Sequence, residues 1–201
     1  MLLTVHRVGQ ALCLSATGLI CFGAVSLLPL SRITLPVAAV ELADGTVAFV
    51  NPPRLTAAST TRNGVDENAT YYLTLDLPAE ASVGLQRVTI RLSEGRAPLL
   101  RFNLGATTAF EGTRYARGAT LPLAAVTEDR DSQTVTIEFD PAVAPGRTVT
   151  LALRPNRNPH VGGVYLFEVT AYPAGERVQS YFSGYARLQF YENDRDNYPF
   201  F

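Results

Sequence analysis

The chain has 201 residues, of which 47% are hydrophobic and 17% charged, and its formal net charge is −1. This composition is typical of a globular protein and lies far from that of disordered chains. All 17 basic residues are arginine, which excludes enzymes that need a lysine, such as Schiff-base and P-loop enzymes.

A hydrophobic leader, residues 1–39, is the first predicted segment. Residues 11–30 contain no charged side chain, Arg7 precedes them, and small residues end the segment at Ala39. This order is typical of a secretory signal helix that is cut before Val40. An uncleaved anchor is the alternative, because the run also reaches the ~20 residues that span a bilayer. Both cysteines, Cys13 and Cys21, belong to the leader.

Residues 40–192 are predicted to form one β-sandwich domain. Alternation of apolar and polar residues marks six strands, at 70–77, 86–93, 134–139, 147–154, 164–172 and 184–191, and weaker candidates at 46–50, 99–104, 107–110 and 121–126. The run 164–172 is apolar on both faces, which favours a strand covered on both sides. Short strands separated by glycine and proline turns predict an all-β antiparallel sandwich, immunoglobulin-like or a related Greek key.

Catalytic residue types are scarce after the leader. His160 is the one remaining histidine and lies in a loop bounded by proline and glycine, so neither a Ser-His-Asp triad nor a transition-metal site is expected. Three strand acids, Asp76, Glu138 and Glu168, leave open a carboxylate glycoside hydrolase. The alternative is that these acids pair with arginines, and Glu168 in its apolar run needs such a partner if it is buried. We expect no enzyme and no cofactor.

Two acidic clusters, residues 128–131 and 192–197, are candidates for calcium binding. Oxygen ligands at alternate positions suit Ca²⁺, but each cluster has an arginine in its middle and lacks the glycine and distal glutamate of an EF-hand. Solvated turns are the alternative.

An aromatic stripe near the end of the chain is a candidate binding surface. If residues 181–191 form one unbroken strand, one face carries Tyr181, Ser183, Tyr185, Arg187, Gln189 and Tyr191. Tyrosine offers an apolar ring with a polar tip, which suits sugar rings or a protein partner. The alternative is that these tyrosines cover a sheet edge.

Two stiff loops rich in proline, asparagine and arginine are a second candidate. They contain Arg54 in one and Arg154 and Arg157 in the other. If both loops lie at one end of the sandwich, the three guanidinium groups form a site for an anion or an acidic partner. Hydrogen bonds from these arginines to loop carbonyls are the alternative.

Several phrases of the sequence carry a family resemblance. They lie at residues 49–55, 71–78, 85–90, 110–114, 139–141, 145–146, 153–159, 162–167 and 173–176. In this order, from about Val40 to Tyr191, the chain resembles an uncharacterised family of secreted cyanobacterial proteins, a domain-of-unknown-function family. The resemblance implies one exported domain and assigns no catalytic residue.

Together these observations favour a secreted, periplasmic or extracellular module of the cell envelope that has a binding or structural role and no enzymatic activity. The partner is an unknown envelope protein or polysaccharide, and the alternative is a calcium- or carbohydrate-binding domain. Loss of the leader brings the net charge to about −3, so nucleic acid is not expected as a partner. A membrane is expected only through an uncleaved leader, and residues 193–201 are predicted to be a C-terminal extension.

Overall fold

The computed structural model of the chain describes residues 40–41, 44–96 and 100–192. The predicted leader, including its signal helix, and the predicted C-terminal extension lie outside these residues. Of the second acidic cluster, only Glu192 is described.

Strands dominate the described residues, and the helical segments there are two short 3-10 turns. The strands are β1 (Val40–Glu41), β2 (Val47–Ala48), β3 (Arg54–Thr60), β4 (Tyr71–Leu77), β5 (Leu85–Glu94), β6 (Thr108–Thr113), β7 (Ala116–Leu121), β8 (Leu123–Asp129), β9 (Thr134–Val143), β10 (Arg147–Leu153), β11 (Gly163–Pro173) and β12 (Tyr181–Phe190). The 3-10 turns are η1 (Ala79–Ala81) and η2 (Leu104–Ala106). None of the helices in the described ranges is long and apolar enough to cross a membrane.

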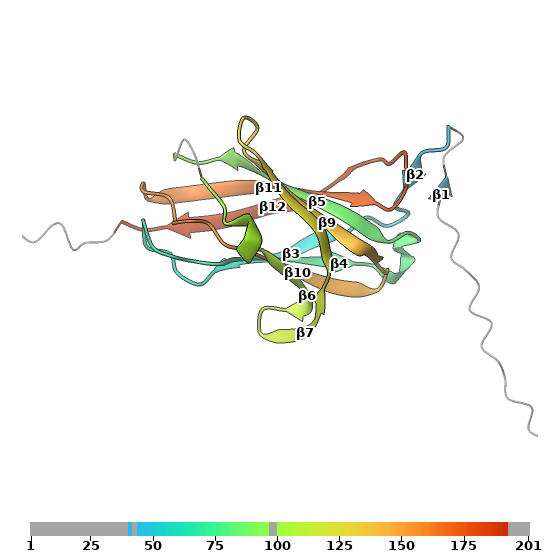
Figure 1. The fold of residues 1–201 in the computed structure, drawn as a ribbon, viewed down its shortest axis with the longest axis horizontal. Coiled ribbons are helices and arrows are strands. Elements are labelled where there is room, and N and C mark those ends of the chain that lie inside the picture. Colours follow the sequence, from blue (N-terminus) through green and yellow to red (C-terminus); the bar gives the residue numbers. More distant parts are fainter. Residues whose placement is uncertain (1–39, 42–43, 97–99, 193–201) are drawn as a thin grey trace, which may run out of the picture. The chain divides into compact units, whose positions relative to one another are not determined.

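Ten of the strands form two five-stranded antiparallel sheets (Figure 1). One sheet has the order β3-β4-β10-β6-β7 and the other β12-β11-β5-β9-β8, while β1 and β2 pair separately. Three strands of each sheet, β3-β4-β10 and β12-β11-β5, follow the ABE and GFC order of an immunoglobulin Greek key. The predicted all-β antiparallel sandwich is therefore confirmed.

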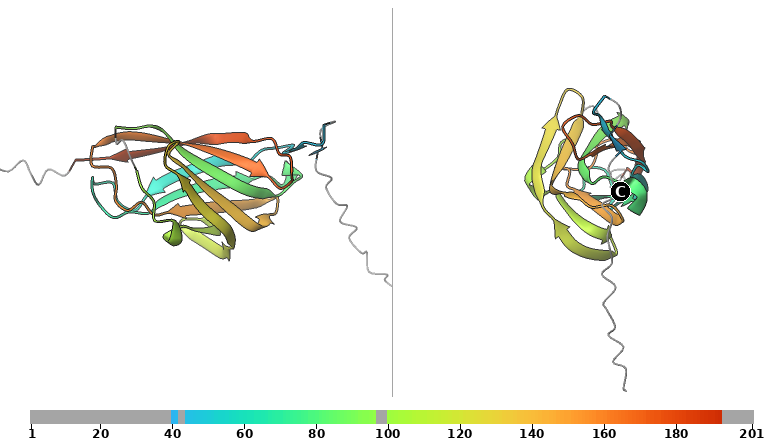
Figure 2. Two further views of the ribbon diagram at one scale, coloured as in Figure 1. Left: turned by 45° about the horizontal axis from the view of Figure 1, so that its top comes forward. Right: turned by 90° about the vertical axis from the view of Figure 1, so that its right-hand side faces the viewer.

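The core lies between the two sheets, which Figure 2 shows from two further sides. Leu73 of β4 pairs with Leu151 of β10, and Ile137 of β9 pairs with Val88 of β5. All four side chains are at most 2% exposed and belong to one apolar cluster. The alternation of period two in these strands puts their apolar residues on the facing sides of the sheets.

Some predictions about individual strands were wrong. Two edge strands, β3 and β7, were not predicted, because their small and polar residues do not alternate in hydrophobicity. Residues 100–104 form no strand beyond a single bridge between Phe102 and Pro155. Strand β11 is fully buried on one face only. Among the described residues, its other face, which carries Leu166 and Glu168, is half-buried.

A bend in the β6–β7 hairpin builds a second small apolar centre on the outer face of its sheet. The pairing register shifts between Phe110 and Gly112, and Gly112 has φ +86°. Phe110 is 1% exposed. The Arg117 guanidinium lies 4.1 Å from the centre of its ring, and the ring centre of Tyr72 lies 6.5 Å away. The hairpin thus covers Phe110 with its own arginine.

Replacing Gly112 by alanine is expected to lower the free energy of unfolding by about 1–3 kcal/mol. An added Cβ would lie 2.2 Å from the Ala116 carbonyl oxygen, at a φ that side chains rarely adopt. Urea denaturation measures the change. In the matched control, Gly105→Ala, the nearest atom outside the neighbouring residues lies 3.8 Å from the added Cβ, so a change within about 0.5 kcal/mol is expected. Equal effects of the two substitutions would contradict this account of the bend.

Candidate functional site

A β-bulge divides β12 and decides which of its side chains face solvent. Val169 of β11 pairs with Gly184 and Thr170 pairs with Phe182, so Ser183 has no opposite residue. Gly184 has φ +139°, and a Cβ there would lie 3.2 Å from the Cβ of Leu55. The bulge therefore occurs where β12 approaches β3 of the other sheet closely.

This bulge corrects the predicted aromatic stripe, because the alternation changes phase at Ser183–Gly184. Tyr181 packs against the core, with its ring centre 5.7 Å from that of Phe49, and Ser183 is buried. Phe182 faces solvent instead. The predicted residues beyond the bulge do share one exposed face. We call the exposed side chains the β12 ridge: Phe182, Tyr185, Arg187, Gln189 and Tyr191.

Two aromatic rings form one end of the β12 ridge. The rings of Phe182 and Tyr185 meet edge to face, with centres 4.9 Å apart, although the two residues are 55% and 53% exposed. Arg187 continues the ridge and its Nη2 donates to Oε1 of Gln189 at 3.5 Å. Along the ridge, two aromatic rings are thus followed by two hydrogen-bonding side chains and then by Tyr191.

A groove runs between the ridge and the neighbouring edge strand β3. Its volume is about 230 Å³, and it is lined by Leu55, Thr56, Ala57, Ala58, Tyr185 and Arg187. Three of the four β3 residues in this lining, Thr56, Ala57 and Ala58, have short side chains. The two edge strands that bound the groove come from different sheets.

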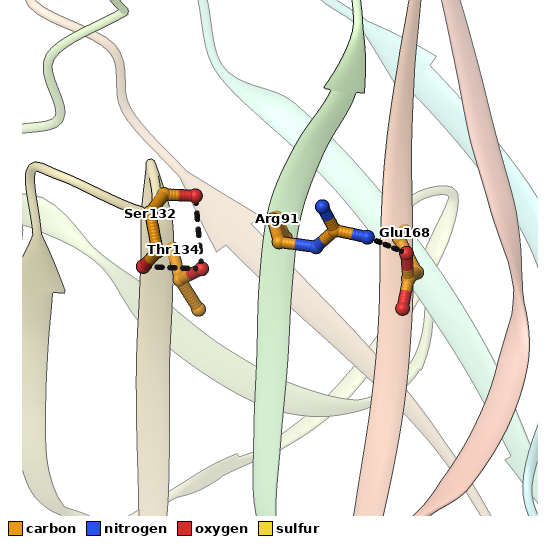
Figure 3. A network of polar contacts seen from close by, with 4 residues as sticks. All are labelled: Arg91, Ser132, Thr134 and Glu168. Carbon is orange, nitrogen blue, oxygen red and sulfur yellow. Dashed lines mark hydrogen bonds and ion pairs between the residues drawn. The ribbon is translucent and has the colours of Figure 1, made fainter.

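Polar side chains cover the sheet surface next to the ridge. Tyr185 pairs with Glu168 of β11, Glu168 with Arg91 of β5, and Arg91 with Thr134 of β9. The Arg91 guanidinium donates to the Glu168 carboxylate across the strands (Figure 3). The expected arginine partner of Glu168 is thereby confirmed.

The next row of the same surface consists of threonines. Thr170, Thr89, Thr136 and Thr127 are paired in succession across β11, β5, β9 and β8. Phe182 stands at the β12 end of this row, opposite Thr170. Hydroxyl groups therefore extend from the aromatic pair across the sheet.

The loop after β10 is fixed by one buried amide. Asn158 is 3% exposed, and its Nδ2 donates to the carbonyl oxygens of Arg62 and Gly64 at 3.1 and 2.8 Å. Its Oδ1 accepts from the Tyr71 hydroxyl at 3.0 Å, and its backbone N–H donates to the Glu67 carbonyl at 2.8 Å. These bonds tie the loop after β10 to the loop after β3.

The donor in this network is a neutral phenol. Burial raises the pKa of Tyr71 above its ordinary value, and the nearby Tyr165 raises it further. The hydroxyl therefore keeps its proton, and it remains a donor to Asn158 wherever the fold is stable.

The three arginines of the predicted anion site do not come together. Thr60, at one end of β3, pairs with Tyr71, which pairs with Leu153 just before Arg154. Arg54 starts β3 at the opposite end, where it pairs with Asp76. Arg154 and Arg157 are exposed at the far end of the sandwich, and Arg157 Nη1 donates to the Asp66 carbonyl oxygen at 3.2 Å.

The three acids of the hydrolase alternative share no cleft. Asp76 lies on the outer face of the β3-containing sheet, where it accepts from the Thr148 hydroxyl at 3.3 Å. Glu138 and Glu168 lie on the outer face of the other sheet, paired with Arg87 and Arg91. This arrangement brings no pair of carboxyls together from the two faces, so it does not support acid-base chemistry on a sugar.

The remaining candidates for chemistry also stay apart. His160 is exposed, and across residues 44–96 and 100–192 it makes no hydrogen bond to a serine or an acid. The described residues hold no group of three histidines, cysteines or acids arranged to bind a metal ion. In the first acidic cluster, the Asp129 carboxylate accepts from the Ser132 hydroxyl and the Asp131 N–H at 2.7 and 3.0 Å, and these bonds lower its pKa.

A family model described as "Protein of unknown function (DUF2808)" matches residues 46–190. The chain belongs to this family. No curated protein matches the chain in sequence. The expected resemblance to a domain-of-unknown-function family is therefore confirmed.

Among solved structures, the N-terminal domain of the Streptococcus gordonii adhesin Sgo0707 is similar at 14% identity and TM-score 0.47, over 72% of this chain and 34% of that chain. The C-terminal domain of the Streptococcus pyogenes antigen I/II-family protein AspA is similar at 13% identity and TM-score 0.42, over 76% of this chain and 45% of that chain. An uncharacterised immunoglobulin-like protein from Nocardia farcinica is similar at 13% identity and TM-score 0.36, over 67% of this chain and 96% of that chain. The chain thus spans less than half of the first two proteins, and similarity at this level identifies no ligand.

Substituting Tyr71 by phenylalanine is expected to destabilise the protein by about 1–3 kcal/mol, because the buried Asn158 Oδ1 would lose its donor. Urea denaturation followed by tyrosine fluorescence measures the loss. The control is Tyr115→Phe, since Tyr115 is 89% exposed, and its loss of a hydroxyl should change stability by less than about 0.5 kcal/mol. Unchanged stability of Tyr71→Phe would show that the Asn158 network does not hold the loops.

Proposed function

We propose that the chain is a non-enzymatic binding module of the cell envelope whose β12 ridge and adjoining groove bind a polysaccharide. The observation that carries the proposal is the exposed Phe182–Tyr185 pair, set beside Arg187 and Gln189 on a bulged edge strand. The groove lined by Tyr185 and Arg187 provides a place for part of a bound ring.

The chemistry of the ridge suits sugars. A pyranose ring has apolar C–H faces and hydroxyl edges, so it stacks on the exposed face of one aromatic ring and needs hydrogen-bonding groups at the border of that ring. Phe182 and Tyr185 supply the apolar surface. Arg187, Gln189 and the neighbouring threonine row supply donors and acceptors at its border.

A protein partner fits the same surface less well. The core of a specific protein interface is depleted of charged residues and buries about 800 Å² on each partner. The aromatic pair of the ridge is bordered by Arg187 and by the Glu168–Arg91 ion pair. The exposed apolar surface is therefore small and broken by charges.

The proposed place of action follows from the leader and not from the folded domain. A charge-free run of residues 11–30 before a small-residue cleavage site favours export, and the mature chain would begin at Val40. The module would then work in the periplasm or outside the cell, and it would touch the membrane only if the leader stays uncleaved.

Tyr185→Ala is expected to abolish polysaccharide binding, because it removes an exposed aromatic ring that lines the groove. Affinity electrophoresis in gels containing dextran, xylan, alginate or polygalacturonate measures the binding, and wild type should be retarded by at least one polymer. Tyr115→Ala is the matched control, since Tyr115 is also exposed but lies in the β6–β7 turn. Retardation by none of the polymers, or equal loss in both variants, would contradict the proposal; capture of an envelope protein through Tyr185 would replace it with a protein partner.

A further inference from the structure

A hollow at the far end of the sandwich has the composition of a sugar-acid site. Its volume is about 310 Å³, at the lower end of the range of small-ligand sites. Its charged and polar lining includes Asp66, Arg101, Asn156, Arg157 and His160. We call it the end cavity.

Three loops frame the end cavity and are bonded to one another. The Asn156 N–H donates to the Arg101 carbonyl oxygen at 2.8 Å, and the Asp66 N–H donates to that of Pro159 at 3.2 Å. The buried Asn158, which also lines the cavity, ties the loop after β10 to the loop after β3 through its side chain. The lining is therefore held in place before any ligand arrives, which lowers the entropic cost of binding.

Neither Arg101 nor Arg157 forms an ion pair within the described part of the chain. The three ion pairs found there use Arg87, Arg91 and Arg147. Arg157 is held through one bond to a backbone carbonyl, that of Asp66. A guanidinium group presents a planar fork of donors that matches the two oxygens of a carboxylate.

A simple anion does not account for the whole lining, because it offers no hydrogen-bond donor to the Asp66 carboxylate. A carboxylated sugar does. Its carboxylate meets the guanidinium groups, while its hydroxyls donate to Asp66 and meet the Asn156 amide. A neutral sugar would leave the net positive charge of Arg101, Arg157 and Asp66 uncompensated.

The end cavity adjoins the β12 ridge. The N–H of Tyr191, the last ridge residue, donates to the Asn63 carbonyl at 2.8 Å, and the Val65 N–H donates to the Tyr191 carbonyl at 3.0 Å. Asp66 follows Val65 directly and lines the cavity. One polymer can therefore contact both the ridge and the cavity.

We infer that the end cavity binds a carboxylated sugar unit, and that the polysaccharide of this module is acidic. This inference rests on the proposed function for the polymer that occupies the ridge. It adds the class of sugar and assigns Arg101 and Arg157 as the residues that select it.

The test compares one ligand in two forms: a galacturonate oligosaccharide and the same oligosaccharide with its carboxyls reduced to neutral alcohols. Isothermal titration calorimetry on the full chain measures both affinities. The acidic form is expected to bind at least about tenfold more tightly, and this preference should fall as salt is added. Arg101→Gln and Arg157→Gln should each remove most of the preference.

Arg154→Gln is the matched control, because Arg154 is exposed in the same loop but does not line the cavity. It should keep the preference. An unchanged preference in Arg101→Gln and Arg157→Gln, or an equal loss in Arg154→Gln, would overturn the inference. So would displacement of the oligosaccharide by acetate at the same carboxylate concentration, which would indicate a plain anion site.

The two proposals fail in different ways. If Tyr185→Ala abolishes binding of both oligosaccharides while the arginine variants keep the wild-type ratio, the ridge binds sugar and the inference about the cavity is wrong. If Tyr185→Ala binds like wild type while the arginine variants lose the acidic form, the ridge proposal is wrong and the cavity stands.

Discussion

The layer of apolar side chains between the two five-stranded sheets is the constraint on which the other features depend. Neither cysteine of the chain lies among the described residues, so no disulfide contributes there. A shift of one residue in any core strand would turn its buried side chains outward, so burial fixes the register of each strand. The side chains on the outer faces and in the end loops are not constrained by this burial, and the candidate binding groups lie there.

Alternation in the sequence predicts the central strands well, because their hydrophobic pattern is the pattern of burial itself. The edge strands were missed for the opposite reason. Residues of β3 and β7 are small or polar, and they form strands because β4 and β6 offer them hydrogen bonds. A neighbouring strand is a property of the fold that no local pattern reports.

The two candidate sites were likewise predicted only in part. Tyr185, Arg187 and Tyr191 could be placed on one face from their spacing, whereas the bulge that exposes Phe182 was missed. Gly184 was the available signal, since a glycine within a strand often marks a bulge. Arg101 had no such signal: it lines the same cavity as Arg157 because two loops far apart in the sequence are bonded at one end of the sandwich, while Arg54 lies at the other end.

The β6–β7 hairpin has a consequence for the dynamics of the domain. Its apolar anchor, Phe110, lies outside the main core and is covered by Arg117 and Tyr72. Strand β7, at the edge of the sheet, is exposed apart from the half-buried Leu121, so it can separate from β6 at a cost below that of global unfolding. Its backbone amides should then exchange with deuterium sooner than those of β5 or β11, so that one fold contains two cooperative units.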